Sequence, residues 1–234
     1  MVEEKRFAGI DEMVAALTDH MAARLTEAVE ARGRASLAVS GGSTPRPLFR
    51  SLAKRPVPWE GVTLTLVDER WVDPAGEESN ERLVRECLLR GPAAAARFIP
   101  LKNGAPDAGA GVAECQGALS AFAGPFDILL LGMGGDGHTA SLFPGADSLK
   151  RGLGLEGSVG DCLAVTPPDA PHERMSLSFP RLLNSREILL MITGEEKWRV
   201  YREALSAGGA EAMLRMPVAA ILGQEGVPVK VYWA

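Results

Sequence analysis

The sequence is poor in cysteine and histidine, and it has no long apolar run. Its three cysteines, Cys87, Cys115 and Cys162, are far apart and show no CxxC spacing. This excludes a disulfide framework that pairs all of them and fits a reducing compartment. None of the three histidines has a partner at a spacing typical of zinc ligands, so no metal site is predicted. Because no apolar segment suits a signal peptide or a membrane span, we expect a cytoplasmic protein.

The sequence also has fewer basic residues than acidic ones. The 25 lysines and arginines are outnumbered by 30 acidic residues, which gives a net charge of -5. Such a chain is a poor partner for nucleic acid or for an anionic membrane surface, although a small phosphorylated ligand needs only a local group of cations. Hydrophobic residues make up 46% of the 234, which is enough to fill a core. With no repeat or linker visible, we expect a single α/β domain over residues 1–234.

Apolar periodicity alternates along the chain between the helical and the extended type. Helices are expected over residues 11–32, 45–54, 79–89, 112–122 and from 193 toward 205. Strands are expected over residues 35–39, 62–67, 98–101, 126–132, 162–165, 175–177, 187–192, 218–222 and 229–233. Gly33 ends the first helix, Ser79 is placed to cap a helix, and Thr193 with Glu196 has the spacing of a capping box. The alternation predicts a mostly parallel sheet with helices on both faces.

The segment 126–145 carries the strongest functional signal. Its apolar first half reads as a strand buried on both faces, and the glycine-rich turn after it includes Gly134 and Gly135. In this turn stand Asp136 and His138, at the sheet edge where α/β folds bind ligands. A lone histidine is usually structural, but this position favours a general base oriented by Asp136. The turn formally matches GxGxxG, yet no acidic residue ends the next strand, which argues against a dinucleotide site.

A second turn, residues 40–45, joins an expected strand to a helix that opens with proline. Exposed N–H groups, two hydroxyls and the helix dipole predict a phosphate site there. Its binding residues would be Gly41, Gly42, Ser43 and Thr44. No lysine precedes the hydroxyl pair as in a Walker loop, so nucleotide hydrolysis is not expected. The plain alternative is a turn that only caps the helix.

Cations and acids that could complete the site follow other strands. Asp68, Glu69 and Arg70 end the 62–67 strand, and Arg70 has the shape to hold a phosphate or carboxylate. Arg174 and Lys197, in later connections, could neutralise an anion as well. The alternatives are that Arg70 pairs with its acidic neighbours and that the other two are ordinary surface cations.

Four motifs together resemble those of 6-phosphogluconolactonases, over nearly the whole chain. They are Ser40-Gly-Gly-Ser-Thr-Pro45, Asp68-Glu-Arg-Trp-Val72, Ser79-Asn80 and Gly132-Met-Gly-Gly-Asp-Gly-His-Thr-Ala-Ser-Leu-Phe-Pro144. The resemblance implies a Rossmann-like fold, hydrolysis of 6-phosphogluconolactone in the pentose phosphate pathway, and no required metal or organic cofactor. It implies that His138 is catalytic with Asp136 as its partner, and it places the substrate against the phosphate turn, Asp68, Glu69, Arg70, Asn80, Gly134, Gly135, Arg174 and Lys197.

Related glucosamine-6-phosphate deaminases share the phosphate turn and the Asp-Glu pair. They follow the histidine with an Asn-Glu-Pro ending, where this chain has Phe143 in the place of the glutamate, and they typically have tyrosine where it has Arg70. These differences favour the lactonase. A non-catalytic sugar-phosphate sensor is the alternative of another class, although no output module is visible. We expect a sugar-phosphate ligand and a monomer or weak homodimer.

Overall fold

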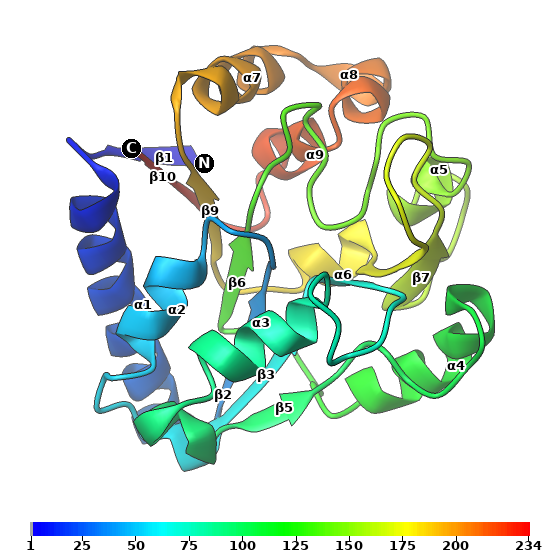
Figure 1. The fold of residues 1–234 in the computed structure, drawn as a ribbon. Coiled ribbons are helices and arrows are strands. Elements are labelled where there is room, and N and C mark those ends of the chain that lie inside the picture. The colour runs from blue at the N-terminus through cyan, green and yellow to red at the C-terminus, as the bar shows by residue number, and fades with distance from the viewer. Residues whose placement is uncertain (1) are drawn as a thin grey trace.

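The main element of the fold is a parallel sheet, seen in a computed structural model that describes residues 2–234 (Figure 1). In spatial order its strands are β1 (Val2–Arg6), β10 (Val229–Trp233), β9 (Ile188–Ile192), β6 (Ile128–Leu131), β2 (Ala35–Val39), β3 (Val62–Leu66) and β5 (Arg97–Ile99). Every neighbouring pair runs parallel. All four residues of the central strand β6 are buried, as its continuous apolar sequence predicts. The mostly parallel α/β fold is thereby confirmed.

Helices surround this sheet, with α1 and α2 on one side of the strands in Figure 1 and α4 and α6 on the other. Their bounds are α1 (Ile10–Arg32), α2 (Arg46–Leu52), α3 (Asn80–Cys87), α4 (Ala108–Leu119), α5 (Leu149–Gly152), α6 (Phe179–Leu183), α7 (Glu195–Ser206), α8 (Gly209–Arg215) and α9 (Val218–Gly223). Short 3₁₀ turns occur at Trp59–Gly61 and Gly91–Ala95. Of the helices in residues 2–234, none is both long and apolar enough to cross a membrane.

A second, smaller sheet departs from the sequence prediction. Strands β4 (Asp68–Arg70), β8 (Arg174–Leu177) and β7 (Cys162–Val165) pair antiparallel, apart from the main sheet. The small sheet begins where β3 ends, because Val67 accepts a hydrogen bond from the N–H of Leu177 at 2.8 Å. It therefore brings new side chains to the carboxyl edge of the parallel strands.

Two local predictions are wrong, and one strand was not predicted. Residues 218–222, expected as a strand, form α9, because a short apolar run does not distinguish a buried strand from a buried helix. The capping box at Thr193 is absent, since α7 begins after Gly194 with no side-chain cap. The strand β1 was not predicted, because only two of its five residues are even partly buried and its sequence is mostly charged. By contrast, Ser79 caps α3 by accepting the N–H of Arg82, as expected.

Candidate active site

A pocket of about 340 Å³ opens where β2, β3, β6 and β9 end. Its volume is in the range typical of small-molecule sites. Each of these strands, or the turn that follows it, contributes to the wall. The rest of the wall comes from the small sheet, the loop 166–173, α3 and α7. The residues that line it are Ser40, Gly41, Gly42, Ser43, Thr44, Pro45, Asp68, Arg70, Asn80, Leu130, Leu131, Gly132, Met133, Gly134, His138, Ala140, Phe143, Ala170, Arg174, Met191 and Lys197.

His138 and Asp136 are in direct contact in the turn that follows β6. Nδ1 of the His138 ring lies 2.6 Å from Oδ1 of Asp136, and the same oxygen accepts the backbone N–H of His138 at 3.1 Å. Gly134 makes this possible, because a Cβ at that position would lie 2.2 Å from Nδ1 of His138. The other ring nitrogen, Nε2, has no hydrogen-bond partner within residues 2–234. With Nδ1–H donated to the carboxylate, Nε2 carries a lone pair that is free to accept a proton.

The Asp136 carboxyl is suited to hold that ring. Desolvation raises its pKa, but the hydrogen bonds from the His138 ring and backbone outweigh this effect, and the net result is a pKa below the usual value. Asp136 is therefore ionised at neutral pH and stabilises one orientation of the imidazole. Phe143 packs against the same imidazole, with its ring centroid 4.3 Å from that of His138. Phe143 thus both packs on the imidazole and lines the pocket.

The turn 40–45 presents free backbone donors to the pocket. Across residues 2–234 no protein group accepts the N–H of Gly41, Gly42, Ser43 or Thr44. Gly42 has φ of 88°, and Gly41 approaches Asn80 so closely that a Cβ there would lie 1.9 Å from Oδ1 of Asn80. Successive unpaired N–H groups of this kind are suited to an anion, and the phosphate site expected from the sequence of this turn stays a prediction.

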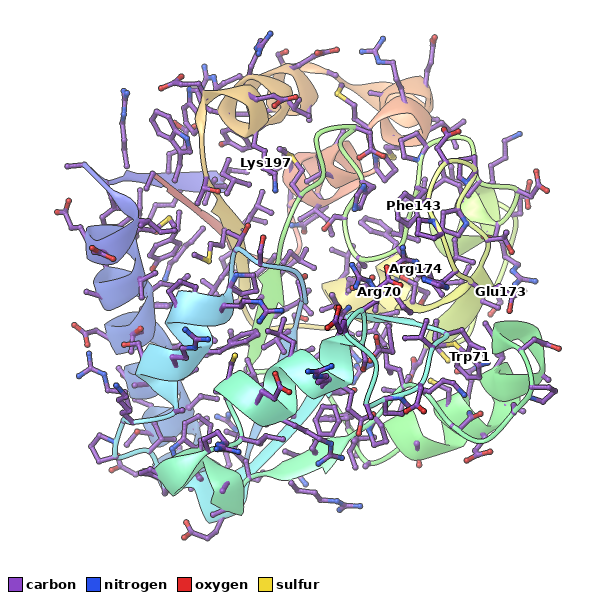
Figure 2. The ribbon with its side chains drawn as sticks, in the orientation of Figure 1. Arg70, Trp71, Phe143, Glu173, Arg174 and Lys197 are labelled. Atoms are coloured by element: carbon purple, nitrogen blue, oxygen red, sulfur yellow. The ribbon has the colours of Figure 1, made fainter. Side chains whose placement is uncertain are left out.

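Three cations, Arg70, Arg174 and Lys197, reach the same pocket from two parts of the fold (Figure 2). Arg70 and Arg174 come from the small sheet, and Lys197 comes from α7. Nη1 of Arg70 donates to the carbonyl oxygen of Glu78, so the arginine bonds to backbone rather than to an acidic side chain. Burial and the neighbouring charge of Arg70 lower the pKa of Arg174. Its Nε is buried without a partner in residues 2–234.

The three residues of β4 divide between two faces. Side chains alternate along a strand, so Asp68 and Arg70 line the pocket while Glu69 points away from it. Oδ2 of Asp68 accepts the Ser141 hydroxyl at 2.6 Å, and its backbone oxygen accepts Nδ2 of Asn80. Asp68 and Asn80 are therefore held together in the wall of the pocket.

Glu69 holds the start of α3 instead. Its carboxylate accepts the N–H groups of Arg70, Asn80 and Glu81 and the hydroxyl of Ser79. Burial raises its pKa to about 6, although the three N–H bonds oppose this shift. Glu69 and Gly135 are absent from the pocket lining, whereas the other predicted binding residues belong to it.

Met191 and Ala170 line the pocket without having been singled out in the sequence. Met191 lies inside the apolar strand β9, and Ala170 lies in a proline-rich loop. Neither position carries a local chemical signal that distinguishes it from ordinary core or loop residues.

Comparison with known proteins places the chain in a family. The family described as glucosamine-6-phosphate isomerases/6-phosphogluconolactonase matches residues 9–233. A 6-phosphogluconolactonase of Rhizobium meliloti (strain 1021) is 44% identical over 219 residues, which cover 94% of this chain and 93% of the relative. One of Pseudomonas putida is 38% identical over 99% of this chain and 93% of the relative. The crystal structure of a 6-phosphogluconolactonase from Shewanella baltica OS155 superposes with a TM-score of 0.95 at 44% identity, covering 100% of this chain and 97% of that one. The chain belongs to the glucosamine-6-phosphate isomerase/6-phosphogluconolactonase family.

Proposed function

We propose that this protein is a hydrolase of the 6-phosphogluconolactone ring, with His138 as the general base. The observation that carries the proposal is the His138–Asp136 contact, which leaves Nε2 of His138 free in a pocket that also holds unpaired N–H groups and three cations. The names of the relatives described above support the reaction and its place in the pentose phosphate pathway.

In this mechanism the phosphate group binds first and fixes the substrate. The N–H groups of the turn 40–45 and the cations Arg70, Arg174 and Lys197 supply its hydrogen bonds and neutralise its charge. Asp68 and Asn80, in the pocket wall, would accept hydrogen bonds from sugar hydroxyls or donate hydrogen bonds to them. The lactone carbonyl carbon then lies at the His138 side of the pocket.

Nε2 of His138 removes a proton from water as the water oxygen attacks the carbonyl carbon. The resulting imidazolium is stabilised by the ionised Asp136 at Nδ1. When the tetrahedral intermediate collapses, the bond from carbon to the ring oxygen breaks, and His138 returns the proton to that oxygen. General acid–base assistance of this kind contributes about 10²- to 10⁴-fold.

The developing oxyanion needs a donor that is not already used. The N–H groups of Gly132, Gly134 and Gly137 donate to Ser40, His138 and Gly134 respectively. The N–H of Met133 has no acceptor in residues 2–234, and Met133 lines the pocket. We therefore assign oxyanion stabilisation to Met133 rather than to those glycines.

Amine chemistry on glucosamine-6-phosphate is the second candidate within the family. The carboxylate bonded to the His138 ring is that of Asp136, and the residue packed against that ring is Phe143 rather than a second acid. This environment favours lactone hydrolysis, which needs only one base.

The test is the disappearance of freshly prepared 6-phosphogluconolactone, measured against its spontaneous hydrolysis. The wild-type protein should accelerate the reaction, and His138→Ala should reduce kcat by about 10²- to 10⁴-fold. Binding of 6-phosphogluconate should survive this substitution, because the phosphate site lies on other segments. Unchanged turnover in His138→Ala would remove His138 from the mechanism, and ammonia release from glucosamine-6-phosphate would redirect the proposal to the deaminase reaction.

A further inference from the structure

Two loops flank Arg70 and Arg174, and a side-chain contact joins the two loops. Residues 71–79 connect β4 to α3, and residues 166–173 connect β7 to β8. Nε2 of His172, in the second loop, lies 2.5 Å from Oε2 of Glu78 in the first. The mechanism described above uses neither residue.

Each loop also supplies the backbone oxygen that holds one arginine. The carbonyl oxygen of Glu78 accepts Nη1 of Arg70. The carbonyl oxygen of Pro171, which precedes His172, accepts Nη2 of Arg174 at 3.0 Å. Both carbonyls therefore lie within one residue of the His172–Glu78 contact, so a shift of either loop would move the guanidinium group that it holds.

The backbone at His172 indicates that this loop is held in place. His172 has φ of 68°, in the left-handed region that non-glycine residues rarely adopt. Such a conformation costs on the order of 1–3 kcal/mol and persists only where neighbouring contacts fix it. The contact with Glu78 is one that fixes it. The same loop brings Ala170 to the pocket wall.

We propose that His172 and Glu78 are positioning residues that set the two loops so that Arg70 and Arg174 converge on the phosphate of the substrate. The inference rests on the phosphate-binding part of the proposed function. Since the two guanidinium groups carry like charge, each needs an acceptor to keep it facing the pocket. His138 and Asp136 lie on a different turn, so we expect an effect on affinity and none on the chemical step.

If the contact served only to stabilise the fold, breaking it would lower the unfolding temperature and would leave the affinity for phosphate unchanged. An ion pair between exposed side chains contributes about 0–1 kcal/mol to stability, and these two side chains are 34% and 55% exposed. Breaking the contact should therefore leave the unfolding temperature nearly unchanged. A loss of affinity without a loss of stability would separate positioning from folding.

The experiment uses His172→Asn, Glu78→Ala and the double variant. Asparagine tolerates positive φ, so His172→Asn removes the imidazole without adding backbone strain. Dissociation constants for 6-phosphogluconate and for inorganic phosphate are measured by calorimetry, and kcat and KM are measured with the lactone. Each single variant should raise the dissociation constant about 5- to 30-fold, as expected when one charged hydrogen bond is misplaced, with kcat within twofold of wild type. The dissociation constant of the double variant should be no higher than that of the weaker-binding single variant, because the two substitutions remove the same contact.

Two further variants sharpen the test. Glu78→Gln keeps an oxygen that accepts from the imidazole, and it should recover most of the affinity lost in Glu78→Ala. His20→Asn is the matched control, because Nε2 of His20 contacts Oε2 of Glu187 at 2.6 Å in a similar histidine–glutamate pair. Glu187 directly precedes β9 and so lies at the amino ends of the parallel strands, whereas the pocket lies at their carboxyl ends. This control should therefore leave phosphate affinity unchanged.

The outcomes separate the inference from the proposed function. If the wild type hydrolyses the lactone but His172→Asn and Glu78→Ala bind both anions as tightly as wild type, the positioning role is wrong and the function stands. Losses that multiply in the double variant would also overturn it. If the wild type binds phosphate without hydrolysing the lactone, the function fails, while the affinities for inorganic phosphate still decide the role of the contact. A wild type that binds neither anion would overturn both.

Discussion

Arg70 and Arg174 lie directly opposite each other on the antiparallel strands β4 and β8. Like charges that face each other across strands destabilise a sheet by up to about 1 kcal/mol. Arg174 is buried, and Arg70 contributes to the lowering of its pKa. No carboxylate in residues 2–234 forms a salt bridge with either guanidinium group. The pair is therefore an arrangement that a bound dianion would stabilise.

Arg174→Met should make the free protein more stable and the ligand complex weaker. Methionine keeps the apolar bulk of the side chain but removes a buried charge and its repulsion from Arg70. We expect the free energy of unfolding without ligand to rise by about 1 kcal/mol. Affinity for 6-phosphogluconate should fall about 10- to 100-fold, the loss expected for hydrogen bonds to a charged group. Urea titration and calorimetry measure the two effects.

Arg24→Met is the control for this exchange. The side chain of Arg24 on α1 is 43% exposed and pairs with Glu27, so its loss should change affinity for 6-phosphogluconate by less than twofold. A lower free energy of unfolding for Arg174→Met in ligand-free buffer would contradict the prediction. It would mean that the bond from Arg174 to Pro171 outweighs the repulsion between the arginines.

Gly41→Ala should weaken phosphate binding by steric displacement alone. The added methyl group would collide with the Asn80 side chain, which is fixed by its bond to the backbone oxygen of Asp68. Either the turn or Asn80 must move, and the free N–H groups of the turn then no longer converge. We expect at least about tenfold weaker binding of 6-phosphogluconate, equivalent to one charged hydrogen bond. Gly104→Ala, where nothing lies within 4 Å of the added atom, should bind normally. Equal affinities in the two variants would show that the turn does not hold the phosphate.

The sequence alone was informative where the chemistry is local. The turn after β6 places Asp136 and His138 two residues apart, and the structure joins their side chains. The free N–H groups of the turn 40–45 likewise follow from glycine and serine next to a strand end. Both features depend on a few consecutive residues, so no knowledge of distant contacts was needed.

Other features depend on pairing between distant segments. That Arg70 faces Arg174 depends on the register between β4 and β8, which no local pattern specifies. Glu69 is a different case, because the alternation of side chains along a strand already separates it from Asp68 and Arg70. Once the segment is recognised as a strand, Glu69 belongs to the opposite face, where it holds α3.

Glu187 should make stability depend on pH in acid. Burial raises the pKa of its carboxyl, but hydrogen bonds from His20 and Lys230 outweigh this and lower it from 4.5 to about 2. A lowered carboxyl pKa adds stability at pH values above 4.5, and that stability is lost as the pH falls toward 2. The shift corresponds to about 3 kcal/mol at most. Between about pH 5 and about pH 2, the free energy of unfolding should therefore fall more steeply in wild type than in Glu187→Gln, by up to that amount. Glu30→Gln, at an exposed position of α1, should follow the wild-type curve. Urea unfolding at a series of pH values measures all three proteins, and parallel curves for wild type and Glu187→Gln would show that the His20 and Lys230 contacts do not stabilise the ionised carboxyl.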